Sequence, residues 1–258
     1  MKAGIITAAG NPPAYGDFRE PVASEGKEII FVRASALSQF SKSRSSGFHY
    51  SSEGVFPSVA GAEGVGQTPD GRRVYFALPE APFGALAERS LVRSKQCVAV
   101  PDGLDDQTAA AIANPGMSAW AALVERAKLQ PGETVMVNGA TGSAGRLAVQ
   151  LAKHLGAGKV IGTGRNEVEL KELLSLGADV IIPLTLGATQ YEEALIAQFS
   201  ASTWWSTTCG AKARGQRSSL SPKLRRTQGP SASYTLAGQA ASKISSYQVL
   251  RCVRRPFS

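Results

Sequence analysis

The pattern of apolar and polar positions divides the chain into two regions that differ in the elements they predict. Residues 1 to about 105 carry short apolar runs separated by Gly and Pro, which is typical of strands joined by turns. The clearest predicted strands are the segments 28–37, 72–78 and 85–92, and the chain opens on a strand-like run at residues 1–6.

From residue 105 the apolar positions follow a helical period instead. Asp105 or Asp106 is expected to cap a helix that runs to residue 113, and Pro115 to begin a second helix that ends at residue 128. Strands then alternate with helices: the predicted strands are 134–138, 159–163 and 178–182, and the predicted helices are 143–155, 168–176 and 189–199. This alternation predicts a parallel, doubly wound α/β sheet.

The turn after the strand 134–138 has the spacing of a dinucleotide-binding fingerprint. It reads A-x-G-x-x-G, with alanine in the first glycine position. Small residues there allow a tight turn, close approach of the backbone to a pyrophosphate and close packing of helix on strand. The N–H groups that open the helix favour phosphate as well. We therefore predict that the cofactor is bound by Ala140, Thr141, Gly142, Ser143, Ala144 and Gly145.

The end of the next strand indicates which nucleotide is bound. NAD sites place an acidic residue about 20 positions on, where it binds the ribose 2′-hydroxyl, whereas an arginine suits a 2′-phosphate. This chain reads Gly164-Arg165-Asn166, with no acid before Glu167. Arg165 can form forked, charge-assisted bonds to a phosphate, with Asn166 as a second donor. A solvated surface arginine is the alternative, but the position favours NADPH over NADH.

The charge of the chain is concentrated at one end. The formal net charge is +8, yet residues 201–258 hold ten Lys and Arg and no Asp or Glu, so the rest of the chain is slightly acidic. The overall charge is therefore weak evidence for nucleic-acid binding. The three cysteines are too widely spaced for a disulfide framework or a zinc ribbon. The chain has no signal peptide and no apolar run of membrane-spanning length, which predicts a cytoplasmic protein.

Several of these segments together resemble the medium-chain dehydrogenase/reductase superfamily, in its zinc-independent, quinone oxidoreductase-like branch. The resemblance covers about 200 residues and rests on the glycine turn, on Gly164-Arg165-Asn166, and on three further stretches, 33–38 (R-A-S-A-L-S), 59–66 (V-A-G-A-E-G-V-G) and 114–120 (N-P-G-M-S-A-W). It implies a GroES-like β domain at residues 1–113, which contributes the substrate site, and a Rossmann NADP-binding domain that begins at residue 114.

The resemblance also implies a reaction and a set of site residues. Hydride would pass from NADPH directly to a quinone or enone, with the intact protein considered as a homodimer. Metal is not expected, because Ala62 stands where the zinc-dependent branch has a histidine ligand. Candidate donors to the substrate are Tyr50, Ser43 and Ser38, although relatives commonly have Asn at position 38 and Tyr near 43. His49 with Tyr50 is an alternative source of polar contacts, or simply a surface pair.

Ser118 resembles the position that approaches the nicotinamide. Its alternative role is that of a plain residue near a helix start. His154 is expected to be only a helix-end residue near Gly156. Neither residue changes the prediction that no metal takes part.

After residue 199 the alternation of strand and helix stops. We expect the Rossmann domain to be incomplete beyond about residue 200, with three strands, and the basic, Ser-rich residues 201–258 to be disordered. Back-translation of residues 203–210 permits V-V-V-D-Y-L-W in a shifted frame, which is similar to the family's next strand. The stretches 229–238 and 249–257 permit further family-like sequences in that frame. These three agreements favour a frameshift near residues 199–203.

Two classes of function remain open from the sequence. The first is a zinc-free, NADPH-dependent oxidoreductase that acts on a quinone or enone and is impaired in this chain. The second is a non-enzymatic or inactive nucleotide-binding protein whose basic tail contacts nucleic acid or another anionic partner. Binding of nucleic acid that weakens steeply as the salt concentration rises, and that disappears when residues 201–258 are deleted, would distinguish the second class from the first.

Overall fold

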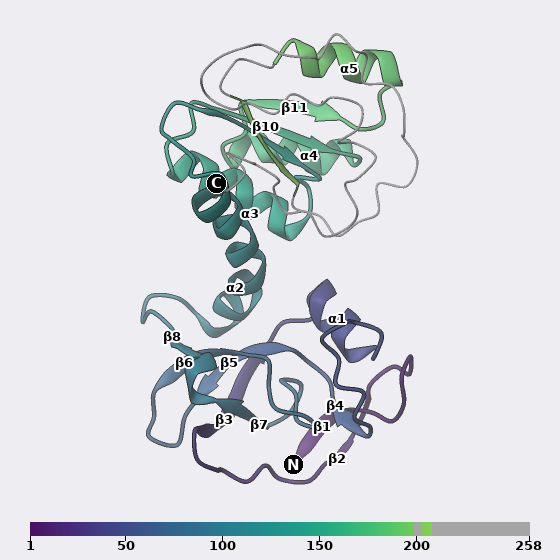
Figure 1. Ribbon diagram of the computed structural model, residues 1–258, viewed down its shortest axis with the longest axis vertical. Helices are drawn as coiled ribbons and strands as arrows, with labels where there is room; N and C mark the ends of the chain where they lie inside the picture. The colour runs from purple at the N-terminus through teal and green to yellow at the C-terminus, as the bar shows by residue number, and fades with distance from the viewer. Residues whose placement is uncertain (199–202, 208–258) are drawn as a thin grey trace, which may run out of the picture. The chain divides into compact units, whose positions relative to one another are not determined.

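The computed structural model describes residues 1–198 and 203–207 (Figure 1). The chain divides into two compact units, Met1–Ala113 and Asn114–Ser258. Most of the predicted tail, residues 201–258, lies outside the described residues, so its predicted disorder is not tested. Within the described part of the chain, no helix is long and apolar enough to cross a membrane.

Unit 1 is built on two antiparallel sheets. The smaller sheet has the order β2-β1-β4, in which β1 spans Lys2–Ile6, β2 Ala14–Asp17 and β4 Ser58–Val59. The larger has the order β7-β3-β5-β6-β8, with β3 at Lys27–Ser35, β5 at Glu63–Gln67, β6 at Arg73–Ala77, β7 at Arg89–Arg93 and β8 at Cys97–Ala99. Helix α1 (Gln39–Ser45) follows β3, and a 3-10 turn, η1 (Ser94–Gln96), precedes β8.

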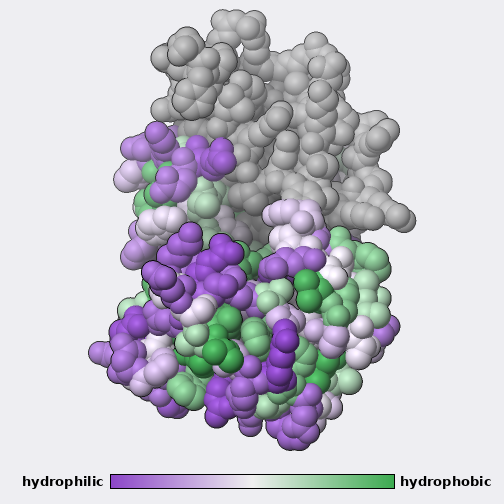
Figure 2. Space-filling view, turned by 60° about the horizontal axis from the view of Figure 1, so that its bottom comes forward, coloured by the Kyte–Doolittle hydropathy of each residue, from purple (hydrophilic) through white to green (hydrophobic). Residues whose placement is uncertain are grey.

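The alternation of side chains along these strands gives unit 1 two small cores. One face of the larger sheet buries Ile30, Val74, Phe76, Ala85 and Val92. Val65 points the other way and packs against Val100, Ala109 and Ala110, the last two from a helix that covers that face. On the surface, apolar side chains are set among hydrophilic ones on the face of unit 1 that Figure 2 shows.

The predicted strands of unit 1 are confirmed with one exception. Segments 28–37 and 72–78 correspond to β3 and β6, but only the end of segment 85–92 lies in β7. Its start belongs to the smaller sheet instead, because Leu86 donates its N–H to Ala60 O and accepts a hydrogen bond from Gly4 N. A single apolar run thus serves two sheets, which its pattern alone does not reveal.

The predicted break at Pro115 is wrong. Helix α2 runs without interruption over Asp106–Trp120, with Pro115 inside it, and continues as a π-helical segment, η2 (Ala121–Arg126). Proline removes one backbone donor, but its fixed φ is compatible with a helix, so the neighbouring hydrogen bonds carry the helix through. Asp105 caps the helix as expected, since its Oδ1 accepts from Thr108 N at 2.8 Å.

Unit 2 is a parallel sheet with the order β11-β10-β9-β12. Its strands are β9 (Thr134–Asn138), β10 (Lys159–Gly164), β11 (Val180–Pro183) and β12 (Thr203–Thr207), and its helices are α3 (Ser143–His154), α4 (Glu167–Ser175) and α5 (Ala188–Ile196). The βα alternation predicted for residues 134–199 is therefore confirmed, and His154 is the last residue of its helix.

The expectation of a sheet with only three strands is wrong. β12 pairs with β9 in parallel, on the side away from β10, so the strand order reverses at β9. In doubly wound sheets this reversal opens the crevice at the carboxyl ends of the strands in which nucleotides bind.

Helices cover both faces of this sheet. Val135 and Val137 of β9 belong to a core that includes α3 residues such as Ala148 and α4 residues such as Leu170. Met136 points to the opposite face, where it packs with Ile161, Ile182 and Leu195 of α5. Figure 1 shows α3, α4 and α5 around the teal and green strands. Both faces of the glycine-turn strand are therefore buried, which is typical of parallel sheets.

Candidate functional site

The glycine turn joins β9 to α3 at the carboxyl edge of the sheet. Gly139 has a φ of 71°, a left-handed conformation that favours glycine. The next residue donates its N–H to Thr163 O at 2.7 Å, which ties the turn to β10. Gly142 is the N-cap of α3 and Ser143 its first residue. The predicted cofactor-binding residues 140–145 thus lie at a helix N-terminus, whose first backbone N–H groups have no partner within the helix.

Two glycines are required because the chain passes very close to them. A Cβ on Gly145 would lie 2.5 Å from the Cα of Ala140, so α3 approaches the turn too closely for any side chain. A Cβ on Gly164 would lie 2.6 Å from Cγ2 of Thr141. The end of β10 is thereby packed against the turn, and the predicted residues Thr141 and Gly164 come together.

A buried polar network stabilises the turn at the ends of β9 and β10. The sequence analysis did not predict it. Thr163 is fully buried, and its hydroxyl donates to Asn138 Oδ1 at 2.7 Å while it accepts from Gly139 N at 3.3 Å. Because the network joins residues that are far apart in the sequence, no local motif predicts it.

Arg165 and Asn166 follow β10 directly, as predicted. Arg165 is exposed, and its guanidinium makes no hydrogen bond or ion pair with the described residues. Asn166 caps α4: its Oδ1 accepts from Val168 N at 3.0 Å and from Glu169 N at 3.3 Å. Since the carbonyl oxygen is used by the cap, only the amide NH₂ of Asn166 is left to donate to a ligand.

These residues fit a dinucleotide with a 2′-phosphate. The lack of a side chain on Gly145 lets α3 pack closely on the turn, and the helix N-terminus favours the negative charge of a pyrophosphate. Arg165 supplies a positive charge after β10 that no described residue pairs, and Asn166 supplies a neutral donor beside it. No acidic residue occupies the position that would bind a ribose 2′-hydroxyl.

Ser118 lies within α2 rather than near a helix start, because the helix does not restart at Pro115. Its Oγ donates to Asn114 O at 3.3 Å, one turn earlier in the helix. This bond is a common local contact of a helical serine. The proposed approach of Ser118 to the nicotinamide stays a prediction.

In unit 1 the candidate residues Ser38 and Ser43 belong to a helix that the sequence did not predict. Ser38 caps α1, accepting from Ser41 N at 3.1 Å, and donates its hydroxyl proton to Glu63 Oε1 at 2.9 Å. The hydroxyl of Ser38 is therefore used within unit 1 both as a hydrogen-bond donor and as an acceptor. Ser43 is exposed on α1 itself.

Glu63 is the centre of this part of unit 1 and is 2% exposed. Besides Ser38, it accepts from the hydroxyl of Tyr75 at 2.7 Å. Burial, together with the neighbouring carboxylate, raises the pKa of Tyr75, which stays a neutral donor. A buried carboxylate of this kind fixes α1 to strands β5 and β6.

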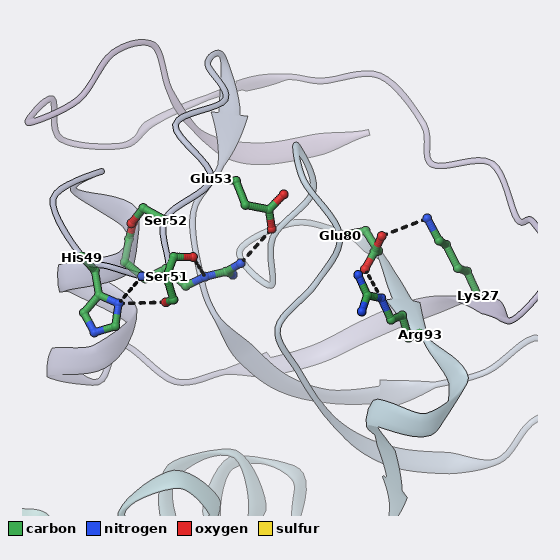
Figure 3. Close-up of polar contacts among 8 residues, drawn as sticks. Lys27, His49, Ser51, Ser52, Glu53, Glu80 and Arg93 are labelled. Carbon is green, nitrogen blue, oxygen red and sulfur yellow. Dashed lines mark hydrogen bonds and ion pairs between the residues drawn. The ribbon is translucent and has the colours of Figure 1, made fainter.

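Tyr50 and His49 lie after α1, and their rings are tilted with centroids 4.3 Å apart. Tyr50 is 83% exposed. Nδ1 of His49 accepts from Ser51 N at 3.1 Å and lies 2.8 Å from Ser51 Oγ (Figure 3). This contact assigns the ring proton of neutral His49 to Nε2, which can donate. The role of either residue toward a substrate stays a prediction.

A small cavity of about 60 Å³ in unit 1 lies beside α1 and the segment that follows it. Its lining is partly apolar, from Ile6, Phe56 and Phe83, and partly charged, from the ion pair of Arg44 with Glu53 at 3.3 Å (Figure 3). Glu80, which accepts from Lys27 and Arg93, anchors one of the loops that bound it. The hydrogen bond from Lys27 and that from Arg93 hold the pKa of Glu80 below its ordinary value.

A metal centre has no support in the described part of the chain. No group of three His, Cys, Asp or Glu residues there lies close enough together to hold an ion. Ala62 occupies the position of the zinc ligand that the resemblance identified, and its side chain has no ligand atom.

Comparison with known proteins agrees with this architecture. The family described as zinc-binding dehydrogenase matches residues 144–250. The chain is 31% identical over 189 residues to a quinone oxidoreductase of Pongo abelii, covering 69% of this chain and 57% of that protein. It is also 31% identical over 182 residues to a chloroplastic NADPH-dependent alkenal/one oxidoreductase of Arabidopsis thaliana, covering 64% of this chain and 47% of that protein. The chain thus spans well under two thirds of the length of these relatives.

A solved structure shares the fold. The quinone oxidoreductase of Thermus thermophilus, whose structure was also determined in complex with NADPH, is 31% identical with a TM-score of 0.66. The similarity covers 76% of this chain and 63% of that chain. In these matches, as in its parallel sheet and glycine turn, the chain is similar to quinone oxidoreductase-like members of the medium-chain dehydrogenase/reductase superfamily.

Proposed function

We propose that this chain derives from a zinc-free, NADPH-dependent oxidoreductase that reduces a quinone or an enone. The observation that carries the proposal is that the glycine turn at the start of α3 and the exposed guanidinium of Arg165, which no described residue pairs, lie at the same edge of the sheet. The names of the relatives, a quinone oxidoreductase and an alkenal/one oxidoreductase, support this class of substrate.

The residues of unit 2 would bind and orient the cofactor. The N–H groups at the start of α3 would bind the pyrophosphate, and Arg165 with the amide of Asn166 would bind the 2′-phosphate. When bound, NADPH supplies a hydride to an electron-poor carbon of the acceptor. A donor such as Tyr50, Ser43 or His49 would stabilise the negative charge that develops on the acceptor oxygen. Ser38 is the weakest of the predicted donors, since its hydroxyl already donates a hydrogen bond to Glu63.

We further propose that activity is impaired in this chain. If the reading frame shifts near residues 199–203, the following residues do not supply the family's remaining strands. The part of the site that those strands build would then be lost, while the glycine turn and Arg165 remain. This chain should therefore still bind NADPH although it does not catalyse the reaction.

Nucleotide binding tests the proposal directly. NADPH and NADH are titrated against the full chain and against Arg165→Gln by calorimetry. Loss of a charged hydrogen bond should weaken NADPH binding about tenfold or more and change NADH binding little. Arg126→Gln is the matched control, because Arg126 is also exposed in unit 2 but lies at the end of η2.

Three results would contradict the proposal. Equal affinity of the unaltered chain for the two nucleotides would exclude the role of Arg165. Binding of neither nucleotide would exclude the cofactor. Binding of a nucleic acid that falls steeply with salt, without any nucleotide binding, would favour the second class of function.

A further inference from the structure

A second arginine lies on the glycine turn itself. Arg146 is in the first turn of α3, and its side chain folds back so that Nε donates to Thr141 O at 3.1 Å. Its Nη2 forms an ion pair with Glu172 Oε2 of α4 at 2.6 Å. The guanidinium is therefore held between the turn and α4.

Thr141 connects this arginine to Arg165. Its carbonyl oxygen accepts from Arg146, and its side chain contacts the backbone at Gly164, the residue before Arg165. The two arginines thus flank one residue of the fingerprint. A phosphate bound by Arg165 beside Thr141 would lie within reach of the long side chain of Arg146.

The guanidinium of Arg146 has capacity for another anion. It carries five N–H donors, of which the contacts with Thr141 and Glu172 use two. The side chain is 30% exposed, so the remaining donors are accessible to a ligand. Glu172 holds the group in place but also brings a negative charge that would repel a phosphate.

We propose that Arg146 is a second phosphate-binding residue of the nucleotide site and that it contributes, with Arg165, to the preference for a 2′-phosphate. This inference rests on the proposed function. Glu172 is a positioning residue in this arrangement, and its charge limits the affinity that Arg146 provides. Removal of that charge should therefore strengthen binding of the phosphorylated nucleotide.

The other end of α3 provides a matched control. Lys153 forms an ion pair with Asp179 at 2.7 Å, and its side chain is 32% exposed, close to the value for Arg146. This ion pair links α3 to Asp179, the residue before β11. Lys153 lies in the last turn of α3, away from the fingerprint. Lys153→Gln thus removes a positive charge and an ion pair from the same helix without touching the site.

The test measures direct binding of NADPH, NADH and adenosine 2′,5′-bisphosphate to the full chain by calorimetry. Arg146→Gln should weaken NADPH and the bisphosphate about tenfold, the value of one hydrogen bond to a charged group, and leave NADH within about twofold. Glu172→Gln should tighten NADPH and the bisphosphate severalfold and leave NADH unchanged. Lys153→Gln should alter none of the three, and thermal unfolding verifies that each variant is folded.

The outcomes separate this inference from the proposed function. If Arg165→Gln removes the preference for NADPH while Arg146→Gln and Glu172→Gln leave it intact, the inference fails and the proposed function stands. Equal weakening of NADPH and NADH by Arg146→Gln would show that Arg146 only shapes the turn, which also overturns the inference. If the unaltered chain binds no nucleotide, both fail. If Arg146→Gln does not fold, Glu172→Gln decides the question alone, and no change in its NADPH affinity would overturn the inference.

Discussion

The hydroxyl of Thr163 donates to the side-chain carbonyl of Asn138 across 2.7 Å and so joins the carboxyl ends of β10 and β9. The same hydroxyl accepts from Gly139 N, the first N–H of the glycine turn. One buried side chain thereby sets both the end of the strand and the start of the turn. The candidate site therefore depends on this contact.

Thr163→Val should destabilise the chain by about 1–3 kcal/mol, because valine has the same shape but leaves buried polar groups without their partner. Denaturant unfolding measures the change. Thr134→Val on the neighbouring strand β9 is the control, since Thr134 is also buried but lies at the start of its strand, away from the glycine turn. Equal losses in the two variants would contradict the role given to the Thr163 hydroxyl.

Much of unit 2 could be predicted because its signals are local. The apolar run 134–138, the small residues at 140, 142 and 145 and the helical period that follows all act within one βα unit. The role of Arg165 follows from its position after the next strand. Thr163, Glu63 and Arg146 could not be assigned in this way, because their partners lie on other elements.

Two errors have identifiable physical causes. Pro115 is a usual first residue of a helix, but here the helix already exists and the proline is accommodated within it. β12 lies in a stretch without a clear period, yet Thr203, Trp204, Trp205 and Thr207 are β-branched or aromatic residues that favour strands. That local preference was a usable signal for the fourth strand.

Gly145→Ala should abolish nucleotide binding and destabilise unit 2. Its Cβ would fall 2.5 Å from Ala140 Cα and 2.6 Å from Gly139 O, which are backbone atoms, so the turn must shift. We expect a loss of about 1–3 kcal/mol, as for overpacking of a core. Gly116→Ala within α2 is the control, since the nearest atom to its Cβ is 4.0 Å away. That variant should be neutral or slightly stabilising.

Tyr75→Phe should destabilise unit 1 through Glu63. The buried carboxylate loses the hydrogen bond from the tyrosine hydroxyl, which we expect to lower the free energy of unfolding by about 1–3 kcal/mol. A double-mutant cycle with Glu63→Gln measures the coupling between the two side chains. A coupling energy near zero would show that Tyr75 acts only by packing.

Asp179 should contribute stability that is lost in acid. Burial acts to raise the pKa of its carboxyl, but the hydrogen bonds from Lys153 and from Val160 N outweigh it, so the pKa lies below its ordinary value. The contribution is complete above the unfolded carboxyl pKa of about 3.9 and is lost as the pH falls through the lower folded value. Asp179→Asn should therefore be less stable than the unaltered chain at pH 6, and the difference should shrink below about pH 4. Urea unfolding across this range measures it, and a constant difference would contradict the assignment.

The gene should contain an extra or missing base near codon 200. The strand β12 occupies a place in a parallel sheet where both faces are normally covered and near-continuous apolar runs are the rule. Residues 203–207 read T-W-W-S-T, whereas the shifted frame permits V-V-V-D-Y over the same codons and so matches that place better. A verified DNA read from codon 190 to well past codon 258 tests this. A clean in-frame sequence in independent reads would make residues 201–258 genuine. A shifted base would direct the quinone and enone assays to the repaired protein, in which we expect β12 to keep its register beside β9 and NADPH turnover to be restored.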